Sequence, residues 1–147
     1  MQRWPYITEE VRRILASMIQ LCDINRWSLN VGDIRLTAGS VWDWYCTIPV
    51  ILVMETLVAQ YAIQNGWLNN EPTFERAINV LYHQEVLNQL LKDWLHYWRK
   101  VRNMVHLHLQ EGVVIHSNPP KMYNDAVLTL QAVEDALLSD WKQNYYS

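Results

Sequence analysis

Apolar residues recur at three- and four-residue steps along most of the chain, the spacing that places side chains on one face of an α-helix. The pattern predicts helices over residues 7–22, 40–65, 73–83, 85–106 and 124–141. The second is apolar over a broad face and is expected to be the central helix. Gly66 suits its end, and Pro49 inside it is expected to kink it or split it into two. The sequence therefore predicts a mostly helical fold.

Two stretches interrupt this pattern. Residues 25–39 contain Asn30, Gly32 and Gly39 and are expected to form a loop, with a short extended piece at 33–36. Residues 105–116 alternate in polarity around a Glu-Gly pair, so a small β-hairpin is an alternative to helix there.

The length of 147 residues predicts a single domain spanning residues 1–147. Half of the residues are apolar, so the chain can bury a core and global disorder is not expected. A net charge of −3, from 12 basic and 15 acidic residues, argues against a general nucleic-acid clamp. Any contact with RNA would have to come from a local patch.

Several features favour a cytoplasmic protein. Cys22 and Cys46 form no CxxC pair and lie in apolar stretches, as expected of buried thiols in a reducing compartment. Residues 1–10 lack the apolar core of a signal peptide. The apolar run at residues 48–63 is too short for a membrane span and contains Glu55 and Gln60, so no membrane association is expected.

The candidate chemistry lies on the helix predicted at 85–106. At about 100 degrees per residue, one sector of this helix collects the expected core face, which is Leu87, Leu90, Leu91, Trp94, Trp98, Val101 and Val105. The next sector holds a polar strip, defined as Arg99, Arg102, Asn103 and His106, at i, i+3, i+4 and i+7. Arginine binds phosphate oxygens, asparagine orients a substrate hydroxyl, and histidine transfers protons near neutral pH.

A structural role is the alternative for the same strip. An arginine of the strip can pair with a carboxylate on another helix, and Glu55, at the edge of the apolar face of 40–65, is the expected partner. His83 and His96 are expected at the surface. No carboxylate or cysteine spacing accompanies His106, His108 and His116, so neither a metal site nor a cofactor is predicted.

The segment at residues 98–106, WRKVRNMVH, resembles the signature of the HEPN superfamily, the higher eukaryote and prokaryote nucleotide-binding domains. That signature is an arginine and a histidine with four to six residues between them, often with asparagine directly after the arginine. Here six residues lie between Arg99 and His106, which is within this range, whereas three lie between Arg102 and His106, one fewer than the usual minimum. Arg102 is the arginine that asparagine follows, so both arginines are kept as candidates. The resemblance implies an all-α, compact bundle of four to five helices.

The resemblance also implies a function. Two subunits would pair as a homodimer so that their strips meet and cleave RNA without a metal, as in toxin or phage-defence ribonucleases. Arg99 or Arg102 would bind the phosphate, His106 would transfer a proton, and Asn103 would fix the geometry. A cognate antitoxin or a nucleotidyltransferase-type protein would be the partner. The alternative is a non-catalytic HEPN-like interaction or nucleotide-binding module.

Overall fold

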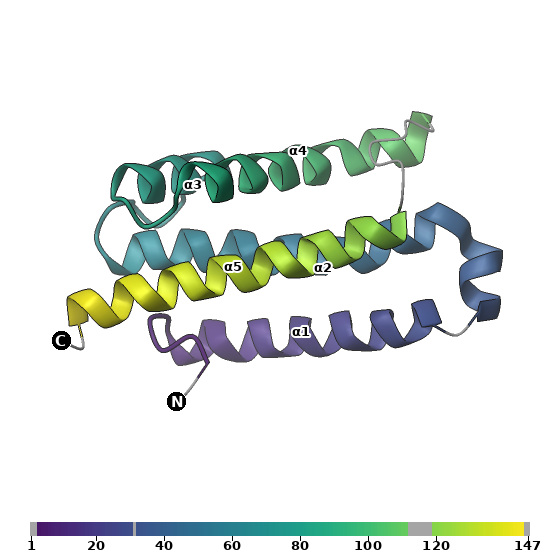
Figure 1. Cartoon of the computed structure of the whole chain (residues 1–147), viewed down its shortest axis with the longest axis horizontal. Helices are drawn as coiled ribbons and strands as arrows, with labels where there is room; N and C mark the ends of the chain where they lie inside the picture. The colour runs from purple at the N-terminus through teal and green to yellow at the C-terminus, as the bar shows by residue number, and fades with distance from the viewer. Residues whose placement is uncertain (1–2, 31, 112–118, 146–147) are drawn as a thin grey trace.

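The computed structural model describes residues 3–30, 32–111 and 119–145, with side chains placed over 3–21, 46–103 and 122–145. It contains the helices α1 (Glu9–Asn30), α2 (Gly32–Gln64), α3 (Phe74–His83), α4 (Gln89–Glu111) and α5 (Pro119–Tyr145). The described ranges contain no strand. Figure 1 shows α1, α4, α5 and most of α2 running along the long axis of the molecule, with the short α3 beside α4. The expected all-α bundle of four to five helices is therefore confirmed.

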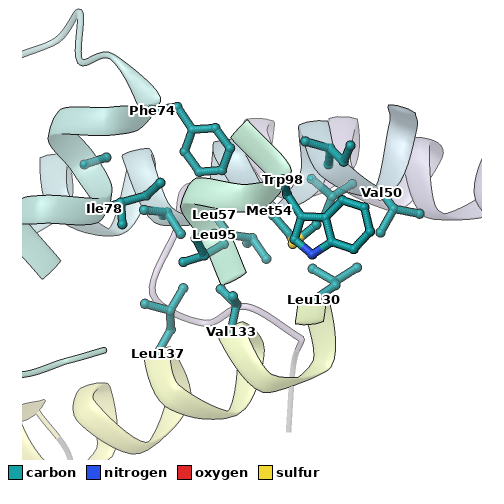
Figure 2. Packing of buried hydrophobic residues seen from close by; sticks show 14 of the residues in the cluster. Val50, Met54, Leu57, Phe74, Ile78, Leu95, Trp98, Leu130, Val133 and Leu137 are labelled. Atoms are coloured by element: carbon teal, nitrogen blue, oxygen red, sulfur yellow. The ribbon is translucent and has the colours of Figure 1, made fainter. Parts of the chain in front are cut away.

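Helix α2 is the central helix, as the sequence predicted, because it contacts each of the other four helices. Figure 2 shows its side chains Val50, Met54 and Leu57 meeting residues of α3, α4 and α5. The indole of Trp98 on α4 lies beside Val50, Met54 and the α5 residue Leu130 (Figure 2). The fully buried large residues come from all five helices and are Leu15, Ile51, Met54, Leu57, Tyr61, Ile78, Leu81, Leu95, Trp98, Met122 and Leu137.

Two aromatic side chains also tie α5 to the bundle through their polar atoms. The Trp98 Nε1–H donates to Thr129 Oγ1 at 3.0 Å, and the Tyr61 hydroxyl donates to the Asp140 carboxylate. Burial and the Asp140 charge raise the pKa of Tyr61 above its usual range, so the phenol remains protonated and keeps this bond. Trp98 and Tyr61 thus each bury a large aromatic ring while their polar atom keeps a hydrogen-bond partner on α5.

The expected loop at 25–39 is wrong, because α1 continues to Asn30 and α2 begins at Gly32. Glycine costs a helix interior only about 1 kcal/mol relative to alanine, and Gly32 stands at a helix start, where its cost is small. Pro49 lies inside α2 without splitting it. Helix α5 begins at Pro119, because proline lacks only an N–H that a first turn leaves unpaired anyway.

The alternative of a β-hairpin at residues 105–116 is wrong for residues 105–111, because these belong to α4. The rest of that stretch, 112–116, lies outside the described residues. All four positions of the polar strip therefore lie on one continuous helix, α4. Their placement on one face required this continuity.

The buried face of α4 is turned relative to the expected one. Leu87, Leu91, Trp98 and Val101 are buried as expected, but Leu95 is fully buried while Leu90 and Trp94 are exposed. The side chain of Val105 lies outside the described set. The helix packs on α2, α3 and α5, and Leu95 lies on its buried face. Leu90 and Trp94, two large apolar side chains, are therefore partly exposed beside α5.

One segment of α2, Cys46–Gln64, is 19 residues long and apolar enough to cross a membrane by length and composition. The sequence argument that residues 48–63 are too short is therefore corrected. Within the bundle 61% of that segment is buried, so packing against the other helices accounts for its apolar composition. Cys46 within it is fully buried, as expected, whereas the Cys22 side chain lies outside the described set.

Two helices end in the same left-handed turn with different residues. After α2, Gly66 has φ +73°, its N–H donates to Ile63 O, and the Trp67 N–H donates to Ala62 O. After α3, Glu85 has φ +62°, and the N–H groups of Glu85 and Val86 donate to Tyr82 O and Leu81 O. These are the paired bonds of a Schellman cap. Glycine adopts this conformation without strain, whereas glutamate does not.

Replacing Glu85 by glycine is therefore expected to raise the free energy of unfolding by about 0.5–1 kcal/mol, because relief of about 1–2 kcal/mol of left-handed strain exceeds the entropy that glycine adds to the unfolded chain. Gly66→Ala is expected to lower it by about 1 kcal/mol through backbone strain alone, since nothing lies within 4 Å of an added Cβ. Chemical denaturation measures both changes. The control is Gln84→Gly, at an ordinary φ of −83°, which should only destabilise. An equal loss in Glu85→Gly and Gln84→Gly would contradict the account.

Candidate functional site

Arg102 of the polar strip is held by another helix. Its Nη1 forms an ion pair with Glu55 Oε2 on α2, and its Nε and Nη2 donate to Asn103 Oδ1 at 3.3 and 3.1 Å. The guanidinium carbon also lies 5.6 Å from the centre of the Phe74 ring, at the start of α3. The side chains of Arg102 and Glu55 are only 28% and 27% exposed. The guanidinium of Arg102 is thus bound by the Glu55 carboxylate and by the side-chain amide of Asn103.

This contact confirms the expected partner of Glu55. The carboxylate follows the fully buried Met54 on the central helix, so it cannot be surrounded by water on all sides. A partly dehydrated carboxylate is stabilised by a cation and by hydrogen bonds. Arg102 supplies both and joins α4 to α2 at the edge of the core.

Arg99 turns to a different helix. Its Nε donates to His96 Nδ1 at 3.3 Å, and its Nη1 lies 3.9 Å from Glu75 Oε2 on α3. The Arg99 side chain is 18% exposed, whereas that of Glu75 is 58% exposed. A long ion pair with a largely exposed partner is worth at most about 1 kcal/mol. Arg99 is therefore more weakly engaged than Arg102, although it is the less exposed of the two.

His96, expected at the surface, is instead half-buried between α3 and α4. Because Arg99 donates to Nδ1, the proton of the neutral ring is on Nε2, which donates to Asn79 Oδ1 at 3.1 Å. Burial, followed by the positive charges of Arg99 and Lys92, lowers the pKa of His96 below the usual 6.5. The imidazole is thus held neutral near pH 7, with both of its nitrogens occupied.

The remaining strip residues are less constrained. The Asn103 side chain is exposed and accepts only from Arg102 among the contacts above. The side chain of His106 lies outside the described set. The α4 backbone at position 106 is helical, which keeps it on the same face as Arg99 and Asn103. The strip therefore divides into an Arg102–Glu55 contact toward α2 and an Arg99–His96 contact toward α3.

A shallow cleft of about 550 Å³ lies beside Arg99. Its lining brings three cations, Lys92, Arg99 and Lys100, together with the carboxylates of Glu75 and Asp93. The nearly balanced charge makes this a weak anion site. Over the described residues, no cluster of three or more His, Cys, Asp or Glu side chains could hold a metal ion.

Sequence reasoning missed the hydrogen bond of His96 to Asn79 and the ion pair of Arg99 with Glu75, both on α3. The one signal available was the spacing of His96 and Arg99, which at i and i+3 are neighbours on a helix surface. Nothing in one sequence indicates which side of residues 74–83 faces α4.

Comparisons with family models, with curated proteins and with solved structures found no match to this chain. The resemblance to the HEPN superfamily at residues 98–106 therefore stays a prediction based on those residues.

The His96 contacts predict a pH-dependent stability. The pKa of His96 is lowered in the folded state, so the unfolded chain binds the proton more tightly. The contribution is complete above the unfolded pKa and is lost as the pH falls below about 6.5 toward the folded value. The free energy of unfolding, measured by urea denaturation from pH 7.5 to 5, is expected to fall less steeply in His96→Gln than in the wild type. Equal slopes in the two proteins, with His83→Gln as the control at an exposed histidine, would contradict this.

Proposed function

We propose that this chain is a non-catalytic, HEPN-like helical interaction module in which the polar strip orders the bundle. The observation that supports this most strongly is the ion pair between Arg102 and Glu55, which joins α4 to the central helix α2. It favours the structural reading of the strip over the catalytic one.

The physical argument concerns what a phosphate ligand would have to displace. Arg102 would have to leave Glu55, and the carboxylate would remain partly buried without its cation. Loss of one partner of such a pair costs about 1–3 kcal/mol. The Glu55 charge would also repel a phosphate that approached the same guanidinium. An arginine kept for substrate is expected to lack a competing anion of this kind.

A metal-independent endoribonuclease of the toxin or phage-defence type is the second candidate. It is favoured by the weaker engagement of Arg99, which lies beside a neutral imidazole, and by the exposure of Asn103 on the same helix face. In this candidate the strips of two subunits meet. The RNA 2′-oxygen attacks the adjacent phosphorus, His106 transfers the proton, Arg99 or Arg102 stabilises the phosphate charge, and the 5′-oxygen leaves.

Both candidates include a cytoplasmic protein that binds other chains. A homodimer is essential only for the ribonuclease, because its site is composite. A cognate antitoxin or a nucleotidyltransferase-type protein would be the heterologous partner. A chain that remains monomeric on size exclusion at high concentration would remove the ribonuclease candidate and leave the interaction module.

Incubation of the full chain with a labelled mixed-sequence RNA in EDTA tests the proposal. No cleavage is expected from the wild type or from His106→Ala, and Arg102→Ala should lower the Tm by at least about 3 °C because Glu55 loses its partner. Arg76→Ala, an exposed arginine on α3, is the matched control and should leave the Tm unchanged.

RNA cleavage of a defined kind would contradict the proposal. Chelation-resistant cleavage that produces 2′,3′-cyclic phosphate ends, and that disappears in His106→Ala and Arg99→Ala while the Tm is unchanged, would replace the interaction module with the ribonuclease.

A further inference from the structure

A groove separate from the polar strip lies between the start of α4 and the middle of α5. Its volume is about 1020 Å³, which is nearly twice that of the cleft beside Arg99. Leu87, just before α4, and Leu91 of α4 form part of its lining and also belong to the hydrophobic core. The groove therefore opens directly onto the core of the bundle, where α4 and α5 are in looser contact than α5 and α2.

Exposed apolar side chains stand on both sides of this groove. Leu90 and Trp94 on α4 are 67% and 40% exposed, and Leu128 on α5 is 62% exposed. They are three of the seven large hydrophobic residues exposed in the described part of the chain. The concentration of exposed apolar residues around one concavity is typical of a binding surface, whereas single exposed residues are normal.

Trp94 is held in position. Its ring stacks on Trp98 with centroids 6.5 Å apart and meets Tyr97 edge-on at 5.7 Å. Trp98 is itself fully buried and bonded to Thr129 of α5. An aromatic side chain that is ordered before binding loses little conformational entropy when a partner covers it. Trp94 is thus suited to act as an anchor of an interface.

The charges around the groove indicate which class of partner it can bind. Among the residues whose side chains are described, its lining includes three carboxylates, those of Glu85, Asp125 and Asp135, and no lysine or arginine. The nearby Lys92 lies over the Tyr82 ring at 4.2 Å. Nucleic acid and anionic lipid would be repelled by this rim. A second copy of the chain, docked groove to groove about a two-fold axis, would bring the same acidic rims together.

The shape of the groove favours a helix as the occupant. Leu90 and Trp94 are four residues apart on α4, and Leu128, Ala132 and Ala136 follow at the same spacing on α5. Two such rows form the ridges between which a third helix packs. The α5 row spans about 12 Å, so it accommodates two to three turns of a partner helix.

We propose that the α4–α5 groove binds an amphipathic helix of a partner protein that presents an apolar stripe flanked by lysine and arginine. The apolar stripe covers Leu90, Trp94 and Leu128, and the flanking cations meet the acidic rim. This inference rests on the proposed function, since it supplies the class of partner that an interaction module of this kind recognises.

A fluorescent synthetic peptide of about 14 residues tests this proposal, with leucine at i, i+3, i+4 and i+7 and lysine elsewhere. Anisotropy titration of the full chain is expected to show saturable binding. The Leu90→Gln/Leu128→Gln variant should bind at least about tenfold more weakly, because it removes the apolar cover of the interface. The control Ile14→Gln/Leu21→Gln changes residues that are 55% and 48% exposed on α1 and should bind as the wild type does.

Charge is tested with the same peptide. Glu85→Gln/Asp135→Gln should weaken binding and reduce its dependence on salt, whereas Glu10→Gln/Glu71→Gln, which removes two exposed carboxylates elsewhere, should not. A peptide with glutamate in place of lysine should not bind.

Three results would overturn the proposal. These are the absence of saturable binding, equal affinity in the Leu90→Gln/Leu128→Gln variant, and loss of self-association in that variant, which would assign the groove to a second copy of the chain. The proposed function is tested separately. Absence of peptide binding together with absence of RNA cleavage removes only this inference, and peptide binding together with RNA cleavage removes only the non-catalytic proposal.

Discussion

The constraint on which the bundle depends is the apolar surface of α2, which has to be covered on several sides at once. Val50, Met54 and Leu57 meet α3, α4 and α5, while α1, over the described residues, packs on α2 and on no other helix. A helix of this composition is stable in water only when neighbours remove most of its surface from solvent. The other four helices all contact α2 and together supply this cover.

Glu55 adds a polar constraint on how α4 packs against α2. Apolar packing alone tolerates rotation of one helix against another, whereas a partly buried carboxylate needs a cation at one place. Arg102 meets that need, and the pair forms at the rotation of α4 seen in the bundle. The same rotation buries Leu95, brings Arg99 and His96 to α3, and leaves Leu90 and Trp94 beside α5. The polar strip and the open groove are thus two consequences of one helix orientation.

Helix type and the central place of α2 could be predicted from the sequence, because apolar periodicity records them directly. The Glu55–Arg102 pair was also accessible, since a carboxylate at the edge of an apolar face requires a partner. The boundaries at Gly32 and Pro119 were not, because single glycines and prolines stop a helix only when packing does not favour it. The His96–Asn79 contact and the exposure of Trp94 depend on helix rotation, which one sequence does not contain.

A double-mutant cycle at Glu55 and Arg102 tests most directly whether the strip orders the bundle. The free energy of unfolding is measured for the wild type, Glu55→Gln, Arg102→Gln and the double variant. The account predicts that each single variant is destabilised and that the pair is coupled by at least about 1 kcal/mol, because each change leaves the other charge without its partner. Additive effects, or an Arg102→Gln variant as stable as the wild type, would contradict it and return Arg102 to a role in binding a ligand.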